Sequence, residues 1–166
     1  MTRGVFTAST AITAAGHNAV TDPPRCRVYN SANISLTSAT PTALTFDTET
    51  MDDGGMHSTS VNTSRITVPS DGAGWYSIGG CVRFAANSTG YREIKIVLNG
   101  ITDIHIARVP NSGATDDVRV TIHTEYPLAV GDYVELYATQ NSGGALNALG
   151  GFVYSPMMYA KWQGVY

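Results

Sequence analysis

The sequence predicts an all-β protein built as an antiparallel sandwich. Apolar and polar residues alternate from Arg25 onward, which is the two-residue period of strands with one buried face. Turn-forming stretches such as "PSDG" at 69–72 and "NSTG" at 87–90 interrupt these runs, at the spacing of roughly 8–12 residues that sandwiches show. No stretch has a convincing helical period. Half-buried sheets must cover each other's apolar faces, so we expect two packed sheets of the jelly-roll type.

The expected strands follow one another along the chain, and alternate residues give each of them an apolar face. In order, the inward-facing sets are Ile66 and Val68; Tyr76, Ile78, Val82 and Phe84; Ile94, Ile96 and Leu98; Ile104 and Ile106; Val118, Val120 and Ile122; and Val134, Leu136 and Ala138. The opposite faces carry polar residues such as Glu93, Lys95 and Arg119. This division is typical of antiparallel sheets with one face in water.

The Asn-Gly pair at 99–100 fixes how two of these strands join. A two-residue loop would pair Ile96 with Asp103 and place a carboxylate on the core face. A three-residue loop shifts the pairing by one residue, so that Ile96 faces Ile104 and apolar residues meet. We therefore expect a three-residue loop with a bulge, and Gly100 at positive φ.

Composition and motifs exclude several classes of function. The 166 residues fit one domain, and charged residues are 14% of the chain, about half the usual share. The net charge is −3 and no basic stripe exists to meet phosphates, so we expect no nucleic-acid binding. No run of apolar residues is long enough to cross a membrane. Catalytic motifs such as GxSxG, HExxH and the Walker loop are absent, and the histidines share no ligand-like spacing. We expect a protein that is not an enzyme and has no cofactor.

The N-terminal residues 1–24 read as an extended arm ahead of a domain at 25–166. Ser and Thr interrupt every apolar stretch near Met1, so the segment does not read as a secretory signal peptide. We expect this arm to dock on another protein. Its anchoring residues would be Val5, Phe6, Ile12 and Val20.

Two cysteines, Cys26 and Cys81, are too few for a disulfide scaffold. A reduced pair of buried thiols is the favoured interpretation, and a bridge between them is the alternative.

Several stretches resemble C1q/TNF-like jelly-roll domains. "ITVPSDGAGWYSIGGCVRF" at 66–84 is similar to the family's strand-turn-strand, in which an apolar strand ends in Pro and a Tyr opens a long central strand. "YPLAVGDYVELYATQNSGG" at 126–144 resembles its later Leu…Gly-Asp signature. "TGYREIKIVLNG" at 89–100, "SPMMYAKWQ" at 155–163 and the stretch at 27–57 match by order and spacing, and the phage-type members are the most similar. The resemblance implies a compact homotrimer with aromatic side chains at the subunit interface.

Four aromatic residues lie on faces that should otherwise be polar. By alternation Trp75 lies opposite Tyr76, and the others face away from the core residues of their strands. A second buried surface, between subunits, would explain them. The expected trimer-interface residues are Trp75, Tyr133, Tyr137 and Tyr159.

These features favour a structural or adhesive protein of a bacteriophage virion. It would be displayed on capsid or tail as a decoration protein, head fibre or receptor-binding protein, with residues 1–24 bound to other virion proteins. It would assemble in the host cytoplasm and be exposed on the particle surface. The alternative is a free-standing bacterial C1q-like module that binds cell-surface glycan or protein. Either would use surface loops, for which the candidate residues are Asp52, Asp53, His57, Asn87, Asn111 and Asn141.

The densest acidic stretch is "DTETMDDGGMH" at 47–57. Oxygen-rich loops can bind Ca²⁺, but this spacing follows no known calcium loop. A solvated loop is the favoured interpretation, and a calcium site stays open as the alternative.

Overall fold

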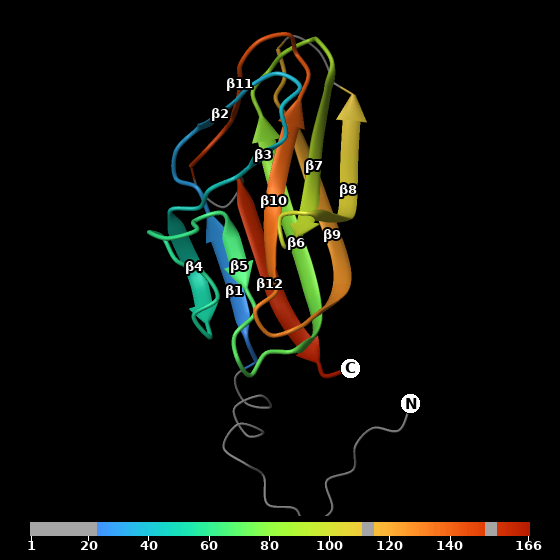
Figure 1. Cartoon of the computed structure of the whole chain (residues 1–166). Helices are drawn as coiled ribbons and strands as arrows, with labels where there is room; N and C mark the ends of the chain where they lie inside the picture. Colours follow the sequence, from blue (N-terminus) through green and yellow to red (C-terminus); the bar gives the residue numbers. More distant parts are fainter. Residues whose placement is uncertain (1–22, 111–114, 152–155) are drawn as a thin grey trace, which may run out of the picture.

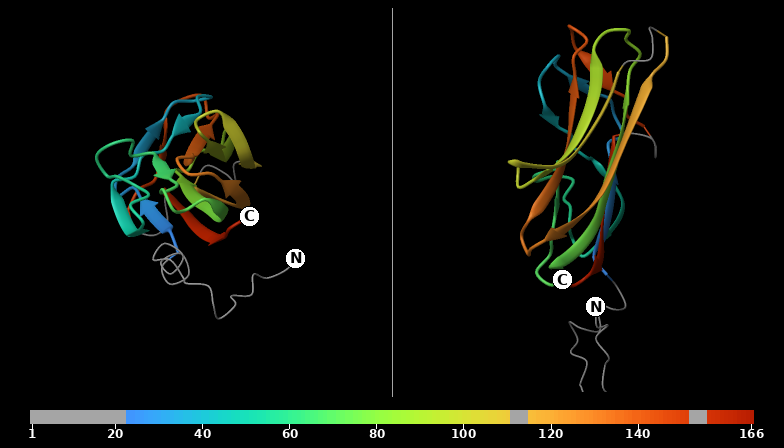
Figure 2. Two further views of the ribbon diagram at one scale, coloured as in Figure 1. Left: turned by 60° about the horizontal axis from the view of Figure 1, so that its bottom comes forward. Right: turned by 90° about the vertical axis from the view of Figure 1, so that its right-hand side faces the viewer.

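The computed structural model describes residues 23–110, 115–151 and 156–166. The expected anchor residues Val5, Phe6, Ile12 and Val20, and the expected loop residue Asn111, lie outside these ranges. The described residues form twelve strands in two antiparallel sheets, which Figure 2 shows as two layers seen edge-on. No helix in this part of the chain has the length and apolarity that crossing a membrane requires.

The first sheet has seven strands, joined around the long central strand β6. In spatial order it contains β2 (Ile34–Leu36), β11 (Leu146–Ala148), β6 (Gly74–Phe84), β12 (Met157–Gly164), β1 (Arg25–Tyr29) and β4 (Thr48–Asp53), and β9 (Val118–Leu128) also pairs with β6. The strand β4, within the acidic stretch, was not expected from the sequence because its residues show no apolar alternation.

The second sheet has five strands, with β10 at its centre. It contains β3 (Thr42–Ala43), β10 (Tyr133–Gln140), β7 (Tyr91–Leu98) and β8 (Thr102–Pro110) in that order, and β5 (Arg65–Thr67) also pairs with β10. Its two edges are therefore formed by short strands on one side and by β8 on the other.

The core lies between the two sheets, where the expected inward faces meet. Tyr76, Ile78, Val82 and Phe84 of β6 are fully buried, and so are Ile94 and Ile96 of β7 and Val134, Leu136 and Ala138 of β10. Val118, Val120 and Ile122 of β9 are also buried. The alternation of the sequence therefore predicted these faces correctly, because each strand buries one side only.

The β7–β8 hairpin confirms the expected loop and corrects the expected face of β8. Leu98 pairs with Thr102 across a three-residue loop, and Gly100 has a φ of 71°. The register then shifts between Ile96 and Val97, so Ile96 pairs with His105 and not with Ile104 as expected. This bulge turns the rest of β8 over, so Ile106 is 48% exposed and not in the core as expected.

The sandwich has two distinct ends (Figure 1). The base is the end at which β1 begins and β12 finishes. The apex is the opposite end, formed by the loops at residues 37–41, 85–91 and 141–145. Whatever precedes residue 23 therefore joins the molecule at the end remote from the apex.

Candidate functional site

Two of the four expected interface aromatics lie on the outer surface of the first sheet. This surface, made by β9, β6, β12, β1 and β4, is called the open face here. Trp75 is 44% exposed on it, and Tyr159 lies opposite Gly79 across the β12–β6 pair. A Cβ atom at Gly79 would come within 2.6 Å of the Tyr159 ring. Only glycine at position 79 lets the Tyr159 ring pack this closely on β6.

The Tyr159 ring continues into a polar contact at the β9 edge. His123 stacks on it, with ring centroids 6.5 Å apart and planes at 29°. The Ser77 hydroxyl lies 3.0 Å from Nε2 of His123. Together these contacts hold an aromatic surface in place on an exposed sheet.

A hollow of about 430 Å³ opens on the same face beside Tyr159. It is lined by Arg25, Cys26, Arg27, Met51, Met157, Tyr159, Ala160 and Lys161. Its lining combines apolar side chains, among them two methionines and the Tyr159 ring, with the cations Arg27 and Lys161. Sequence reasoning missed the hollow because Met51 comes from the unexpected strand β4, and only the pairing of β4 with β1 brings it beside Arg27.

The other two expected interface aromatics lie on the opposite side of the molecule. Tyr133 and Tyr137 belong to β10, on the outer surface of the second sheet. The Arg65 guanidinium lies 3.9 Å above the Tyr133 ring and 3.4 Å from the Glu135 carboxylate. This surface is called the sealed face here, because arginines cover its rings and carboxylates.

A second set on the sealed face repeats this arrangement at its apical end. Arg108 lies 4.1 Å above the Tyr91 ring, and its Nε is 2.7 Å from Glu93. The carboxylate side chains of Glu93 and Glu135 are each only 6% exposed. Burial, and then the nearby Glu135 and Tyr133, raise the pKa of Tyr137. Arg65 and Arg108 thus cover the rings of Tyr133 and Tyr91 and pair with the two glutamates within one copy of the chain.

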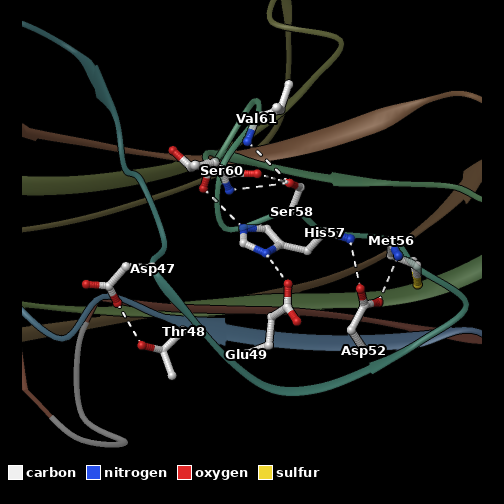
Figure 3. Close-up of polar contacts among 10 residues, drawn as sticks. Asp47, Thr48, Glu49, Asp52, Met56, His57, Ser58, Ser60 and Val61 are labelled. Atoms are coloured by element: carbon white, nitrogen blue, oxygen red, sulfur yellow. Dashed lines mark hydrogen bonds and ion pairs between the residues drawn. The ribbon is translucent and has the colours of Figure 1, made fainter.

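The acidic stretch folds around a buried histidine (Figure 3). Nδ1 of His57 lies 3.0 Å from Glu49, and Nε2 lies 3.2 Å from the carbonyl oxygen of Thr63. The His57 side chain is fully buried and meets Phe46 edge to face. Both ring nitrogens lie within hydrogen-bond distance of a partner, so the buried ring links Glu49 of β4 to the loop at Thr63.

The aspartates of this stretch also serve the local fold. Asp52 accepts hydrogen bonds from the backbone N–H groups of Met56 and His57, and Asp53 pairs with Arg25. Within the described ranges no group of three His, Cys, Asp or Glu residues is arranged to hold a metal ion. The expected loop residues here are therefore engaged in structure.

Asp47 is tied down at the start of the same stretch. The backbone N–H of Ser31 donates to it at 2.9 Å and the Ser31 hydroxyl at 2.6 Å. Partial burial acts to raise the pKa of Asp47, but the hydrogen bonds from Ser31 and Thr48 outweigh it and hold the pKa below its ordinary value of 3.8.

The two cysteines are buried thiols that do not form a disulfide. Burial, followed by the nearby Asp52 and Glu49, raises the pKa of Cys26 far above its ordinary range. Burial also raises the pKa of Cys81. A protonated, buried thiol is a poor nucleophile.

Of the expected loop residues, the structure brings Asn87 and Asn141 together at the apex. Gly90, in the same loop as Asn87, packs so closely on the Asn141 backbone that a Cβ atom would fall 1.7 Å from the Asn141 carbonyl oxygen. The expected residues Asp52, Asp53 and His57 belong to a separate site at the β4 edge of the first sheet.

The comparisons with known proteins show the fold. No family model matches the sequence, and no curated protein matches it. The structure is similar to that of murine APRIL, with a TM-score of 0.63 and 10% identity over 84% of this chain and 98% of that one. It is also similar to the globular domain of zebrafish complement 1qA, with a TM-score of 0.61 and 13% identity over 87% of this chain and 100% of that one. The sandwich is a C1q/TNF-like jelly roll.

Proposed function

We propose that the protein is a non-enzymatic display module of a bacteriophage virion. Three copies associate through their open faces, residues 1–24 attach the trimer to other virion proteins, and the apex points outward. The observation that carries this proposal is the open face, which presents exposed Trp75, the Tyr159 ring and a hollow lined in part by methionines on one sheet. The arrangement of the ends supports it, because the chain enters at the base and the apex lies opposite.

The open face has the composition of a subunit interface. Interfaces have apolar, aromatic and Met-rich centres, and arginine is enriched in them. Aromatic and arginine anchors supply most of the affinity. The sealed face lacks exposed rings of this kind because Arg65 and Arg108 cover them. Association through the open face would bury Trp75 and the apolar side chains that line the hollow.

Two regions of the open face complement each other. At the β9 edge, Trp75 pairs with Pro127 and exposed Glu125 lies opposite Ser77. The β9 edge carries an aromatic ring and a carboxylate. The hollow is lined by apolar side chains and by the cations Arg27 and Lys161. In the proposed trimer, Trp75 and Glu125 of each copy enter the hollow of the next. Such head-to-tail contacts close into a ring of three when each copy is rotated by a third of a turn from the last.

Charge reversal tests this contact directly. Glu125→Lys and Lys161→Glu, each made alone, place like charges together and are expected to prevent association. Both changes in one chain restore opposite charges and are expected to recover the trimer. Light scattering should give three times the 17.6 kDa chain mass for the wild type and for the double variant.

A matched control adds a lysine on the other sheet. Thr102→Lys lies on exposed β8, and is expected to leave the mass unchanged. A wild-type monomer would overturn the proposed assembly. If the trimer survives each single charge reversal, the assembly does not use the proposed contact of Trp75 and Glu125 with the hollow.

Attachment through residues 1–24 is proposed from the sequence resemblance to phage-type members and the base location of residue 23. A chain that begins at Arg25 is expected to form the trimer and to lose binding to virions. The assay is co-sedimentation with particles that lack the protein. Equal decoration by the full and shortened chains would contradict the attachment role.

A further inference from the structure

We propose that the apex is a preformed binding site for an uncharged carbohydrate chain. The inference rests on the proposed function, in which the apex is the outward end of a displayed trimer. It is carried by two fully buried polar side chains that tie the apical loops together, and by the chemistry of the surface that those loops present.

The apical end of the core is closed by polar side chains. Arg92 of β7 and Gln140 of β10 lie directly opposite each other in the strand pairing. Both continue the inward faces of their strands, beyond Ile94 and Ala138, and both are 0% exposed. An apolar pair would fill this space without burying a charge, so the polar pair points to a role other than packing.

Arg92 ties together the loop at 85–91. Its Nη1 donates to the carbonyl oxygens of Thr89 and Tyr91 at 3.0 and 2.9 Å, and its Nη2 donates to that of Asn87 at 2.9 Å. Burial lowers the pKa of Arg92. Three hydrogen bonds from one rigid guanidinium fix the shape of this loop.

Gln140 ties together the other two loops. Its Nε2 donates to the carbonyl oxygens of Leu36 and Gly144 at 2.9 and 2.8 Å, and its Oε1 accepts from the Ser142 N–H at 2.7 Å. The Ala39 N–H donates to the Gln140 carbonyl oxygen at 2.7 Å. The Asn141 N–H donates to the Tyr91 carbonyl oxygen at 3.3 Å, which joins the loop at 85–91 to the other two. The three loops therefore form one cross-linked surface before any partner arrives.

The loops present hydrogen-bonding groups without charge. Residues 37–41, 85–91 and 141–145 are Thr, Ser, Ala, Pro, Asn, Gly and one Tyr, with no charged side chain among them. Beside them, directly ahead of β9, lie the exposed Asp116 and Asp117, and Asp117 pairs with Arg83. Exposed members include Thr40, Ser88, Thr89 and Asn141. Amides, hydroxyls and accessible backbone match the hydroxyl groups of a neutral sugar. A sulfated, phosphorylated or sialylated partner would call for cations that these loops do not supply.

Rigidity matters because a carbohydrate offers little apolar area to bind. Affinity from a few hydrogen bonds survives only when the protein loses little freedom on binding. The buried pair provides this preorganisation, so Arg92 and Gln140 are positioning residues and do not touch the ligand.

The test begins with the full-length trimer on an array of neutral oligosaccharides and their sialylated and sulfated counterparts. We expect binding to one or more neutral chains. The affinity should be the same at low salt and at about 0.5 M NaCl, because that salt concentration screens charge contacts and no ion pair contributes here. No binding to neutral chains, or binding only to charged ones that salt abolishes, overturns the inference.

Two matched pairs of variants locate the site. Asn141→Asp adds a charge at the apex, whereas Asn62→Asp makes the same change in the exposed loop before β5. Affinity for the neutral chain should fall by about tenfold or more, a readily measured change, in the first variant only. Equal effects in both variants would exclude the apex.

The second pair tests preorganisation. Gly90→Ala drives a methyl group into the Asn141 carbonyl, whereas Gly131→Ala has the same left-handed backbone but nothing within 4 Å. Both variants carry similar backbone strain, so both should lose a similar amount of thermal stability. Only Gly90→Ala should also lose affinity for the carbohydrate. If Gly90→Ala fails to fold, the Asn141 and Asn62 pair still decides.

The outcomes separate this inference from the proposed function. A trimer that binds no neutral carbohydrate sinks the apex site and leaves the proposed assembly standing. A monomer that binds a neutral chain, with the Asn141 dependence, does the reverse.

Discussion

Gly80 of β6 packs against Leu136 of the second sheet, and replacing it with alanine should destabilise the fold. A Cβ atom there would lie 2.8 and 3.0 Å from the two methyl groups of Leu136, and 3.0 Å from the Met157 carbonyl oxygen. Leu136 is 0% exposed and has no space to retreat. Overpacking of this kind costs about 1–3 kcal/mol, and the stiffer unfolded chain returns about 0.4–1 kcal/mol. We expect Gly80→Ala to lose about 1–2 kcal/mol of unfolding free energy.

Urea denaturation at one fixed protein concentration measures this loss, because association adds to apparent stability when concentration varies. The matched control is Gly144→Ala, which has no atom within 4 Å of its Cβ and no left-handed φ. It should be neutral or slightly stabilising. If Gly80→Ala unfolds at the same urea concentration as Gly144→Ala, the sheets do not pack as closely as Leu136 and Gly80 require, and the explanation of this mid-strand glycine is wrong.

Three further outcomes are expected. Gly79→Ala should displace the Tyr159 ring from β6 and weaken trimer formation in sedimentation velocity, while far-ultraviolet circular dichroism stays unchanged; an intact trimer at all concentrations would contradict this. Ser31→Ala should raise the pKa of Asp47, seen by NMR titration of its carboxyl carbon. Since the folded pKa is lowered, Asp47 stabilises the fold above its ordinary value of 3.8, and this contribution is lost as pH falls below it; an unmoved titration would exclude the hydrogen bond from the Ser31 hydroxyl as a cause. Tyr76→Phe removes a buried 2.7 Å hydrogen bond to a loop carbonyl and should cost about 0.5–1.5 kcal/mol in thermal unfolding, and no cost would mean that water replaces the hydroxyl.

The sequence predicted the core well because the core depends on period alone. Each long strand buries one side, so alternate residues such as Ile94, Ile96 and Leu136 could be assigned without knowing which strands pair. The predicted inward face of β8 was wrong beyond the bulge. A single extra residue there reverses the direction of every later side chain, and the apolar–polar alternation does not reveal its position. Ile106 is exposed for this reason.

The functional surfaces were harder to predict because they depend on contacts between strands distant in sequence. Arg65 covers Tyr133 only because β5 pairs with β10, and the hollow exists only because β4 pairs with β1. The buried Arg92 could have been predicted from the sequence, because it lies two residues before Ile94 in the same strand and therefore faces inward. A charged residue at an inward position predicts either a buried network or a strand end, and here both apply.

The two faces of the sandwich explain why an aromatic residue at an outward position has two structural meanings. On the sealed face, each arginine comes from an edge strand, β5 or β8, and reaches over a ring to a carboxylate on the neighbouring strand. Ring and charges are then covered within one copy.

On the open face, the rings belong to the inner strands β6 and β12, and the cations beside them line a hollow. A ring that lacks such a cover is the one that gains most free energy from a partner surface, because its burial is still to come. The partner must be apolar at its centre and acidic at its margin. The Trp75–Glu125 edge of another copy has that composition, which is why we propose self-association through the open face and not through the sealed one.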